Sequence, residues 1–285
     1  MTASGGTGRA ACVIGWPAAH SRSPLIHRYW LKLHGIVGDY RAEAIPPERF
    51  AAFVQNLAAH GYVGANVTVP HKTAALALSQ PDARAQAIGA ANTLWLDHGI
   101  LRATNTDAEG FIGNLDAAAP GWDAGIDTVL VLGAGGSARA VVFGLIDRGV
   151  PRVLIANRTL GRGEALAADF SPAAQAIAWE AVGEHLGATR LLVNTTTLGM
   201  AGQPPLVIAL DRLPDDAVVA DLVYVPLETG LLTAARGRGL RCADGLGMLL
   251  HQAVRGFALW FGVTPQVTAA LRALVEADLK QTAPS

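Results

Sequence analysis

Apolar residues occur in short runs that alternate with amphipathic stretches, a pattern typical of a fold in which strands and helices follow each other. The run at 128–132 is apolar enough to be a buried parallel strand. A helical stretch follows up to residue 146, Gly149 and Pro151 end it, and a second β-rich run covers 152–156. Strand, turn, helix and strand within about thirty residues predict a dinucleotide-binding unit of the Rossmann type.

The turn of this unit, residues 133–138, fits the pattern G-x-G-x-x-A. Gly133 permits the tight turn, Gly135 lets the backbone approach a pyrophosphate, and Ala138 allows the helix to pack closely on the strand. The helix N-terminus adds N–H groups and the positive end of a dipole. Such glycines can also be purely structural, but the flanking elements favour nucleotide binding.

Two arginines, Arg158 and Arg162, follow the second strand of this unit. A site for NAD would place an acid here to hold the ribose 2′-hydroxyl, and the first acid is Glu164. Both arginines can bind a 2′-phosphate through charge-assisted hydrogen bonds, although either could be a solvated loop residue. The sequence therefore predicts NADP rather than NAD.

The same periodicities predict an α/β fold of two domains, with a Gly-rich turn at 121–125 between them. We expect further strands at 10–15, 39–45, 63–69, 90–95, 100–103, 190–194, 217–223 and 240–243, and further helices at 25–33, 46–60, from 70, at 84–88, 110–115 and 264–279, with Asp244 as the N-cap of a long helix.

Polar residues gather where the early strands are expected to end, which is where open α/β sheets bind ligands. Thr68 and Lys72 follow one strand, and Lys72 falls in the first turn of a helix, where the dipole disfavours a cation. That position suits a proton-transferring lysine, while a solvated surface lysine is the alternative. Ser23 before Pro24 is typical of an N-cap, whereas Ser21 has no such explanation, and together they could bind a carboxylate.

Two polar clusters flank a predicted hairpin, one at Asn92 and one at 105–107. Asp107 near a helix start is ordinarily a cap or a partner of the dipole. The two clusters together make a shared cleft more plausible. Gln252, two turns into the long helix, would reach the same cleft if that helix crosses back from the nucleotide domain.

Composition narrows the class of protein. The 285 residues suffice for two domains, and a net charge of −1 with 16% charged residues gives no sign of a nucleic-acid or membrane partner. No apolar run has the length of a membrane helix, so we expect a soluble, cytoplasmic protein. Cys12 and Cys242 are predicted to be buried free thiols rather than metal ligands, and the segment 1–9 a disordered tail.

Taken in order, these motifs resemble the shikimate dehydrogenases, two-domain NADP enzymes of aromatic biosynthesis. The resemblance covers nearly the whole chain, and the segments that carry it are 20–24, 65–72, 92–94, 105–107, 133–136, 157–159 and 243–249.

The resemblance implies a role for each of these groups. Ser21 and Ser23 would bind the substrate carboxylate, with Tyr224 nearby. Thr68, Lys72, Asn92, Asp107 and Gln252 would surround the ring hydroxyls, Lys72 and Asp107 being the catalytic pair. NADP would be held by Gly133, Ala134, Gly135, Gly136, Ser137, Asn157, Arg158, Thr159 and Arg162, with Leu222 and Gly245 at the nicotinamide end. The substrate domain would comprise 1–110 and 246–285, and the nucleotide domain 111–245.

The implied activity is reversible, NADP-dependent reduction of 3-dehydroshikimate to shikimate by hydride transfer. A quinate/shikimate dehydrogenase of broader specificity and a non-catalytic NADP-sensing module are the alternatives, and a homodimer is left open. The Lys72–Asp107 pair argues against the sensor, which needs only the nucleotide half. The sequence departs from the family at Trp16, usually Asn, at His71, commonly Phe, at Ala108, usually Gly, and at Leu222, often Met, which leaves fine substrate preference open.

Overall fold

A computed structural model of the protein describes residues 8–19 and 21–282, and the chain divides into two compact units. The first unit comprises Met1–Thr106 and Gln252–Asp278, and the second Asp107–His251 and Leu279–Ser285. Both are α/β, which confirms the predicted fold class. The domain limits expected from the sequence, 1–110 with 246–285 and 111–245, stay a prediction. Residues 1–7 of the expected tail lie outside the described residues, and Arg9 already begins the first strand.

The first unit is built on a mixed sheet of order β2-β1-β3-β5-β6-β4, parallel at β2-β1-β3 and β6-β4 and antiparallel on both sides of β5. Its strands are β1 (Arg9–Gly15), β2 (Gly38–Ala44), β3 (Tyr62–Val67), β4 (Gln80–Pro81), β5 (Thr93–Asp97) and β6 (Ile100–Thr104). Its helices are α1 (Ser23–Leu33), α2 (Pro47–Gln55), α3 (Lys72–Ala77) and α4 (Ala83–Ile88), with the later part of α10 (Gly245–Phe261) and most of α11 (Ala269–Thr282).

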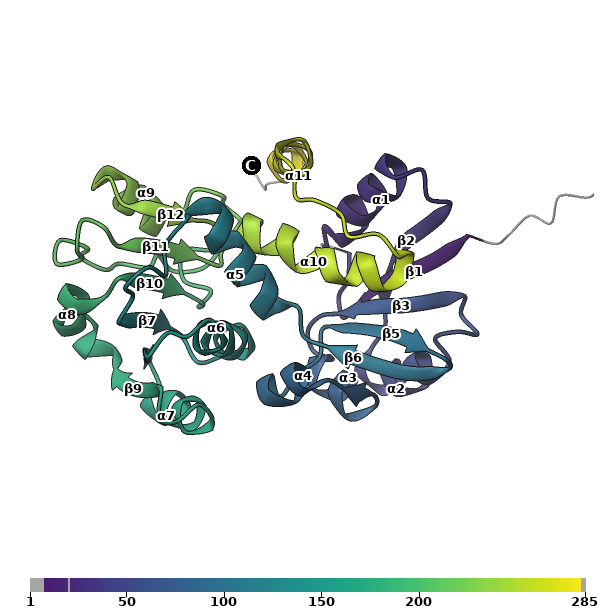
Figure 1. Ribbon diagram of the computed structural model, residues 1–285, viewed down its shortest axis with the longest axis horizontal. Helices are drawn as coiled ribbons and strands as arrows, with labels where there is room; N and C mark the ends of the chain where they lie inside the picture. Colours follow the sequence, from purple (N-terminus) through teal and green to yellow (C-terminus); the bar gives the residue numbers. More distant parts are fainter. Residues whose placement is uncertain (1–7, 20, 283–285) are drawn as a thin grey trace, which may run out of the picture. The chain divides into compact units, whose positions relative to one another are not determined.

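Helices cover both faces of this sheet (Figure 1). Helices α2, α3 and α4 pack on one face, where Phe50 and Val54 meet Cys12 and Ile14 of β1. The other face is covered by α1 and α10, whose aromatic side chains pack against each other and against Tyr40 of β2; they are His27, Trp30, Phe257 and Trp260. Apolar burial on both faces explains why β1 consists of consecutive buried residues.

Helix α10 approaches this sheet closely at Gly64 of β3. Trp260 Nε1 donates a hydrogen bond of 2.8 Å to the Leu94 carbonyl, and a Cβ added at Gly64 would lie 2.0 Å from the same Nε1. Glycine at position 64 is therefore what lets the indole reach the backbone of β5.

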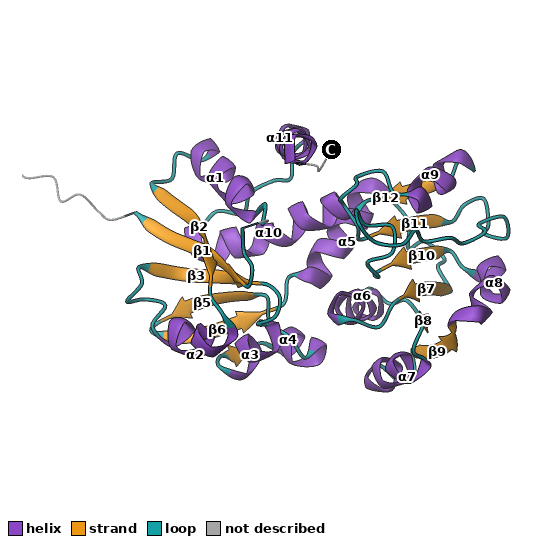
Figure 2. Cartoon of the chain, turned by 180° about the vertical axis from the view of Figure 1, so that it is seen from behind, coloured by secondary structure: helices purple, strands orange, loops and turns teal. Residues whose placement is uncertain are grey.

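The second unit is a fully parallel, doubly wound sheet of order β12-β11-β10-β7-β8-β9 (Figure 2). Its strands are β7 (Thr128–Leu132), β8 (Arg152–Asn157), β9 (Ala174–Ala178), β10 (Leu191–Asn194), β11 (Val218–Asp221) and β12 (Arg241–Ala243). Its helices are α5 (Asp107–Ala118), α6 (Gly136–Asp147), α7 (Leu160–Asp169), α8 (Val182–His185) and α9 (Gly230–Gly237), with two short 3₁₀ turns beside α8. This arrangement is the predicted Rossmann type.

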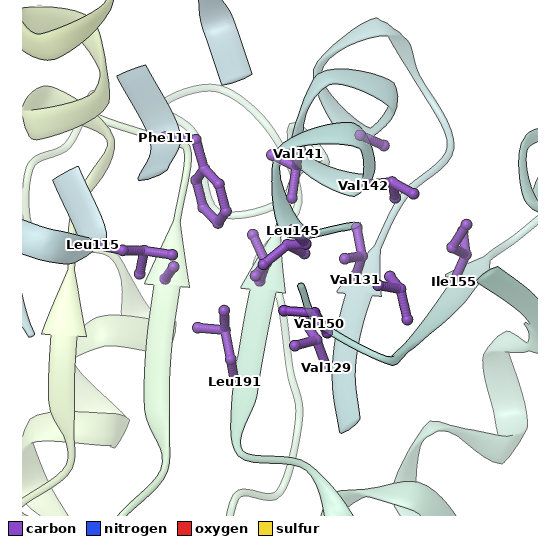
Figure 3. Close-up of a cluster of buried hydrophobic side chains, with 14 of the residues drawn as sticks. Phe111, Leu115, Val129, Val131, Val141, Val142, Leu145, Val150, Ile155 and Leu191 are labelled. Carbon is purple, nitrogen blue, oxygen red and sulfur yellow. The ribbon is translucent and has the colours of Figure 1, made fainter. Parts of the chain in front are cut away.

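The core of the second unit has one layer on each face of the sheet. Figure 3 shows the layer under α5 and α6, in which Phe111, Val141 and Leu145 lie over Val129 and Val131. The other layer packs residues of α8 and α9 against Leu130 and Leu132 of the same strand β7. Alternate residues of β7 thus serve opposite layers, as expected for a central parallel strand.

Some sequence-based expectations were wrong in detail. The turn at 121–125 does not separate the units, because Trp122 is buried in the core of the second. Strands β4 and β9 were missed, α2 ends at Gln55 rather than at 60, and the last helix begins at Ala269 rather than at 264. Cys12 is buried as expected, but Cys242 is only partly buried. None of the helices within 8–19 and 21–282 has the length and apolar character needed to cross a membrane.

Candidate active site

The loop after β1 carries Ser21 and Ser23. Arg22, not Ser23, occupies the N-cap position of α1, and its carbonyl accepts a hydrogen bond of 3.2 Å from the Ile26 N–H. The Ser23 N–H donates to Ser21 Oγ at 3.3 Å. The prediction that Ser23 caps the helix is therefore wrong, because the helix begins one residue earlier than the Ser-Pro pattern suggested. Helix capping is therefore not the reason for a serine at position 23.

The end of β3 places Thr68 and Lys72 as the sequence predicted. The Thr68 N–H donates to the Ile14 carbonyl at 2.9 Å, and the Thr68 carbonyl accepts from the His71 N–H at 3.0 Å. Lys72 is the first residue of α3, and its carbonyl accepts from the Ala91 N–H at 3.0 Å. These backbone bonds fix Thr68, Lys72 and the start of β5 relative to each other.

Asn92, which is 2% exposed, lies at the centre of this edge of the first unit. Its Oδ1 accepts hydrogen bonds from the Thr106 N–H at 2.8 Å, from Thr106 Oγ1 at 3.2 Å and from Thr93 Oγ1 at 3.0 Å. Its Nδ2 donates to Gln252 Oε1 at 3.3 Å, so the structure brings Asn92 and Gln252 together. The amide is held in one orientation, and Gln252 with it.

A buried pair behind Asn92 was not identified from the sequence. Tyr40 Oη donates to Asn66 Oδ1 at 2.6 Å, and Asn66 Nδ2 donates to the Asn92 carbonyl at 3.3 Å and to Thr93 Oγ1 at 3.2 Å. Burial raises the pKa of Tyr40 well above its ordinary value, so the phenol remains a hydrogen-bond donor. The signal was present as a polar Asn66 within the apolar run of β3.

Asp107 and Tyr224 belong to the second unit. Asp107 is the first residue of α5, is 8% exposed, and directly follows Thr106 in the chain. Tyr224 lies three residues after the end of β11 and is partly buried. Their assignment to the substrate stays a prediction.

The glycine turn after β7 has the geometry that a nucleotide-binding turn requires. Gly133 has a φ of 107°, a conformation that side chains with a Cβ rarely adopt, and its N–H donates to the Ala156 carbonyl at 2.7 Å. A Cβ at Gly135 or Gly136 would meet no described atom within 4 Å, so the backbone at the start of α6 is open to a ligand. Ala138 is fully buried against the sheet, as the fingerprint predicts.

The segment after β8 is exposed from Arg158 to Arg162. Asn157 Nδ2 donates to the Thr159 carbonyl at 2.8 Å and so shapes the turn before α7. The side chains of Arg158 and Arg162 are exposed, and no acid occurs between positions 157 and 163. Two accessible guanidinium groups with no competing carboxylate in the segment fit the 2′-phosphate of NADP.

A second buried network joins the ends of β10 and β11, and the sequence analysis missed it. Asp221 accepts hydrogen bonds from Asn194 Nδ2 at 2.9 Å, from the Val223 N–H at 3.0 Å and from Thr229 Oγ1 at 2.7 Å. Burial raises the pKa of Asp221. Asn194 Oδ1 in turn accepts from the Thr196 N–H at 3.0 Å. One Asn–Asp pair therefore shapes both loops at this edge of the sheet.

Leu222 and Gly245 meet directly beside that network. A Cβ added at Gly245 would lie 2.2 Å from the Leu222 carbonyl oxygen, so only glycine permits this approach. Asp244 Oδ1 accepts from the Gly247 N–H at 3.0 Å, which confirms Asp244 as the cap of α10.

The departures noted in the sequence have different surroundings. His71 is buried, stacks on Phe50 with ring centroids 4.3 Å apart, and contacts the Ile45 carbonyl through Nε2 at 2.7 Å. Ala108 packs beside Gly144 within the second unit. Trp16 is 50% exposed, and its N–H donates to the Val69 carbonyl at 3.1 Å. His20 lies outside the described residues.

Comparisons with known proteins agree with this arrangement. Residues 13–94 match the family described as the shikimate dehydrogenase substrate binding domain, residues 122–199 match shikimate / quinate 5-dehydrogenase, and residues 245–275 match the shikimate 5′-dehydrogenase C-terminal domain. A curated relative from Nitrobacter hamburgensis, named shikimate dehydrogenase (NADP(+)), is 69% identical over 273 residues, which are 96% of this chain and 95% of the relative.

Two solved structures are also similar. Shikimate 5-dehydrogenase from Thermus thermophilus in complex with NADP(H) and shikimate is 35% identical with a TM-score of 0.81, covering 96% of this chain and 99% of that one. Quinate dehydrogenase from Corynebacterium glutamicum in complex with NAD is 30% identical with a TM-score of 0.88, covering 95% and 99%. The identity to the Nitrobacter relative, over nearly the full length of both proteins, confirms the resemblance inferred from the motifs: the chain belongs to the shikimate dehydrogenase family.

Proposed function

We propose that the protein catalyses the reversible, NADP-dependent reduction of 3-dehydroshikimate to shikimate, a step of aromatic amino-acid biosynthesis. The observation that carries the proposal is the Asn92–Gln252–Thr106 network, in which Asn92 and Thr106 are buried and Gln252 is partly buried. It lies at the edge where Thr68 follows β3 and Lys72 begins α3. Such a fixed set of amide and hydroxyl groups suits a polyhydroxylated ring. The curated relatives at 65–69% identity carry the name of this NADP enzyme.

The cofactor proposal depends on charge and on backbone geometry. The open backbone at Gly135, Gly136 and Ser137 would hold the pyrophosphate, and Arg158 and Arg162 the 2′-phosphate. Leu222 and Gly245 would line the nicotinamide end. When bound, the cofactor supplies or accepts the hydride.

The residues of the chain would handle binding and the proton. Ser21 and Ser23 would bind the carboxylate with help from Tyr224, while Thr68, Asn92 and Gln252 bind ring hydroxyls. Lys72 would transfer a proton to the oxygen of the ketone as it becomes an alcohol, and Asp107 would orient and balance the charge of Lys72. In the oxidative direction the proton passes back to Lys72.

A quinate dehydrogenase is the second candidate, because the Corynebacterium structure is similar at a TM-score of 0.88. Quinate carries an additional ring hydroxyl, which the fixed Asn92–Gln252 pair would have to accommodate. We also propose a cytoplasmic location, supported by the free thiols of Cys12 and Cys242. Self-association as a homodimer stays a prediction.

The test is a coupled comparison of substrates and cofactors. Purified protein is mixed with shikimate or quinate and with NADP or NAD, and the reduced nicotinamide is followed by absorbance. We expect shikimate with NADP to give the highest kcat/KM of the four combinations. Comparable kcat/KM for quinate and shikimate would favour the second candidate, and equal use of both cofactors would contradict the role of Arg158 and Arg162.

A further inference from the structure

An ion pair connects the serine loop to the last helix within the first unit. Arg22 Nε lies 2.6 Å from Asp278 Oδ2 of α11, and both contacting atoms are shielded from solvent. The side chains are 16% and 36% exposed, so the pair is partly buried. Figure 2 shows α11 lying beside α1. The last helix therefore contacts the residue that separates Ser21 from Ser23.

Arg22 lies at the start of α1, directly between the two serines. Arg22 is the N-cap residue of α1, where the helix dipole disfavours a cation, and Asp278 compensates that charge. The Arg22 backbone lies between the Ser21 hydroxyl and the Ser23 N–H, which are joined by a hydrogen bond of 3.3 Å. A shift of Arg22 would therefore move both serines.

We propose that Arg22 and Asp278 are positioning residues, a pair through which helix α11 holds Ser21 and Ser23 in the geometry that binds the substrate carboxylate. The inference rests on the proposed function, since it concerns the same carboxylate. Neither residue has to touch the substrate. The pair makes carboxylate affinity depend on a helix that is more than 240 residues away in the sequence, as the positions 22 and 278 show.

The charge of Asp278 allows a test that separates an effect of its electric field from a positioning role. The two explanations predict changes of opposite sign in the KM for shikimate. If Asp278 acts only through its field, Asp278→Asn removes a negative charge near an anion-binding loop and should lower the KM for shikimate. If Asp278 positions Arg22, the same change should raise that KM, by about three- to tenfold, the range for a partly buried ion pair. We expect the increase, with kcat changed less than about twofold because no reacting group is lost.

The matched control lies on the same helix. Glu276→Gln removes one acid from the Arg272–Glu276 pair, whose atoms are 2.7 Å apart and whose side chains are 36% and 29% exposed. We expect its KM for shikimate to equal that of the unmodified protein. NADPH affinity, followed by nicotinamide fluorescence, should be the same in both variants, and the melting temperatures should be similar.

The outcomes separate this inference from the proposed function. An unchanged or lowered KM in Asp278→Asn overturns the positioning role, and so does an equal rise in Glu276→Gln, which would indicate general damage to α11. Ser21→Ala/Ser23→Ala is measured in parallel. If that variant raises the KM while Asp278→Asn does not, only the inference fails, whereas an unmodified protein without activity on shikimate overturns both.

Discussion

The sheet edge of the first unit to which we assign the substrate and the sheet edge of the second unit to which we assign NADP are built in contrasting ways. At the first, Asn92 is 2% exposed, and its amide is bonded to Thr93, Thr106 and Gln252. At the second, Arg158 and Arg162 are exposed and the glycine turn presents open backbone. At the first edge the polar groups are already hydrogen-bonded to each other within the protein. At the second edge the charged side chains are exposed to solvent.

The difference teaches how each edge can discriminate between ligands. A preorganised polar network rejects a molecule that leaves a buried group unpaired, which suits recognition of hydroxyl positions on a ring. Exposed arginines distinguish ligands by charge, and their contribution is screened by salt. We therefore expect substrate specificity and cofactor specificity to respond differently to mutation and to ionic strength.

The largest effect on activity is expected for the proposed catalytic pair, Lys72 and Asp107. Lys72 belongs to the first unit and Asp107 to the second. Lys72→Ala should lower kcat at least about 10²-fold, because general acid–base help typically contributes ~10²–10⁴-fold, with little change in NADP affinity. The steady-state kcat for the oxidation of shikimate measures this loss. Asp107→Asn should lower kcat by a similar factor.

The double variant sharpens this prediction. If the two residues act as a unit, its loss should fall far short of the product of the single losses. Fully multiplicative losses would mean that each works independently, and a near-normal kcat in Lys72→Ala would show a solvated surface lysine.

The exposed edge is tested by Arg158→Ala. A hydrogen bond to a charged group contributes ~1.5–3 kcal/mol, so NADP affinity should fall roughly ten- to a hundredfold while NAD affinity stays nearly the same. Titration of protein fluorescence with each cofactor measures both. The difference between variant and unmodified protein should shrink as salt is raised.

Arg190→Ala is the matched control for that variant. Arg190 immediately precedes β10, at the end of the sheet opposite the glycine turn, and pairs with Asp216. Its removal should leave both cofactor affinities unchanged. A similar loss of NADP affinity in both variants would mean that net charge, rather than a contact of Arg158, decides cofactor binding.

The buried edge is tested by Ser21→Ala/Ser23→Ala. Loss of two hydroxyl donors should raise the KM for shikimate at least about tenfold, since each bond to a charged group contributes ~1.5–3 kcal/mol. NADP affinity should stay unchanged. An unaltered KM would show that these serines only shape the loop.

One buried titratable group in each unit should affect stability in acid rather than activity. Burial lowers the pKa of His27 from 6.5 to about 3. Between these values the unfolded chain binds a proton that the folded chain does not. The free energy of unfolding should therefore fall as the pH drops from 6.5 towards 3, by at most about 1.4 kcal/mol per pH unit from this group, whose contribution is complete above 6.5.

Denaturant titrations of the unmodified protein and of His27→Phe at several pH values measure the contribution of His27 to the free energy of unfolding. In the variant, the free energy of unfolding should depend less steeply on pH. Asp221 in the second unit has the opposite sign, because burial raises its pKa and the folded state favours its protonated form. Asp221→Asn should therefore steepen the loss of stability in acid. If the free energy of unfolding depended on pH in the same way in His27→Phe and Asp221→Asn, the opposite effects expected for these two residues would be contradicted.

The sequence predicted the parallel sheet of the second unit well because strands buried on both faces are continuous apolar runs, as in β7. It missed β9 and β4, the edge strands of the two sheets, because short, partly exposed strands have no comparable pattern. The place of Thr68 at the end of a strand could also be predicted, since residues at the C-terminal edge follow directly from strand limits. Asn92 was expected inside a strand at 90–95, but it lies just before β5, which is antiparallel to β3.

Contacts between distant segments could not be predicted. The Asn194–Asp221 bond joins two strand ends, and the Arg22–Asp278 pair joins the first helix to the last. Both depend on the order of strands and on the path of α11, which local periodicity does not contain. Ser23 was wrongly assigned as a cap for a local reason, because the helix begins one residue earlier than its proline implies.

The close approach of Trp260 to Gly64 also has a consequence for the order in which the protein matures on the ribosome. Domains generally fold as units, the N-terminal one first, while the chain is still being made at about 5–20 residues per second. Here the first sheet is synthesised early, whereas Trp260 and the other α10 residues that cover part of its aromatic face are synthesised much later. The second unit, apart from the few residues after Leu279, is one continuous segment and is complete before them. The nascent first sheet therefore lacks the part of its cover that α10 provides until α10 has been synthesised, and a chain that stopped before α10 would leave that part exposed.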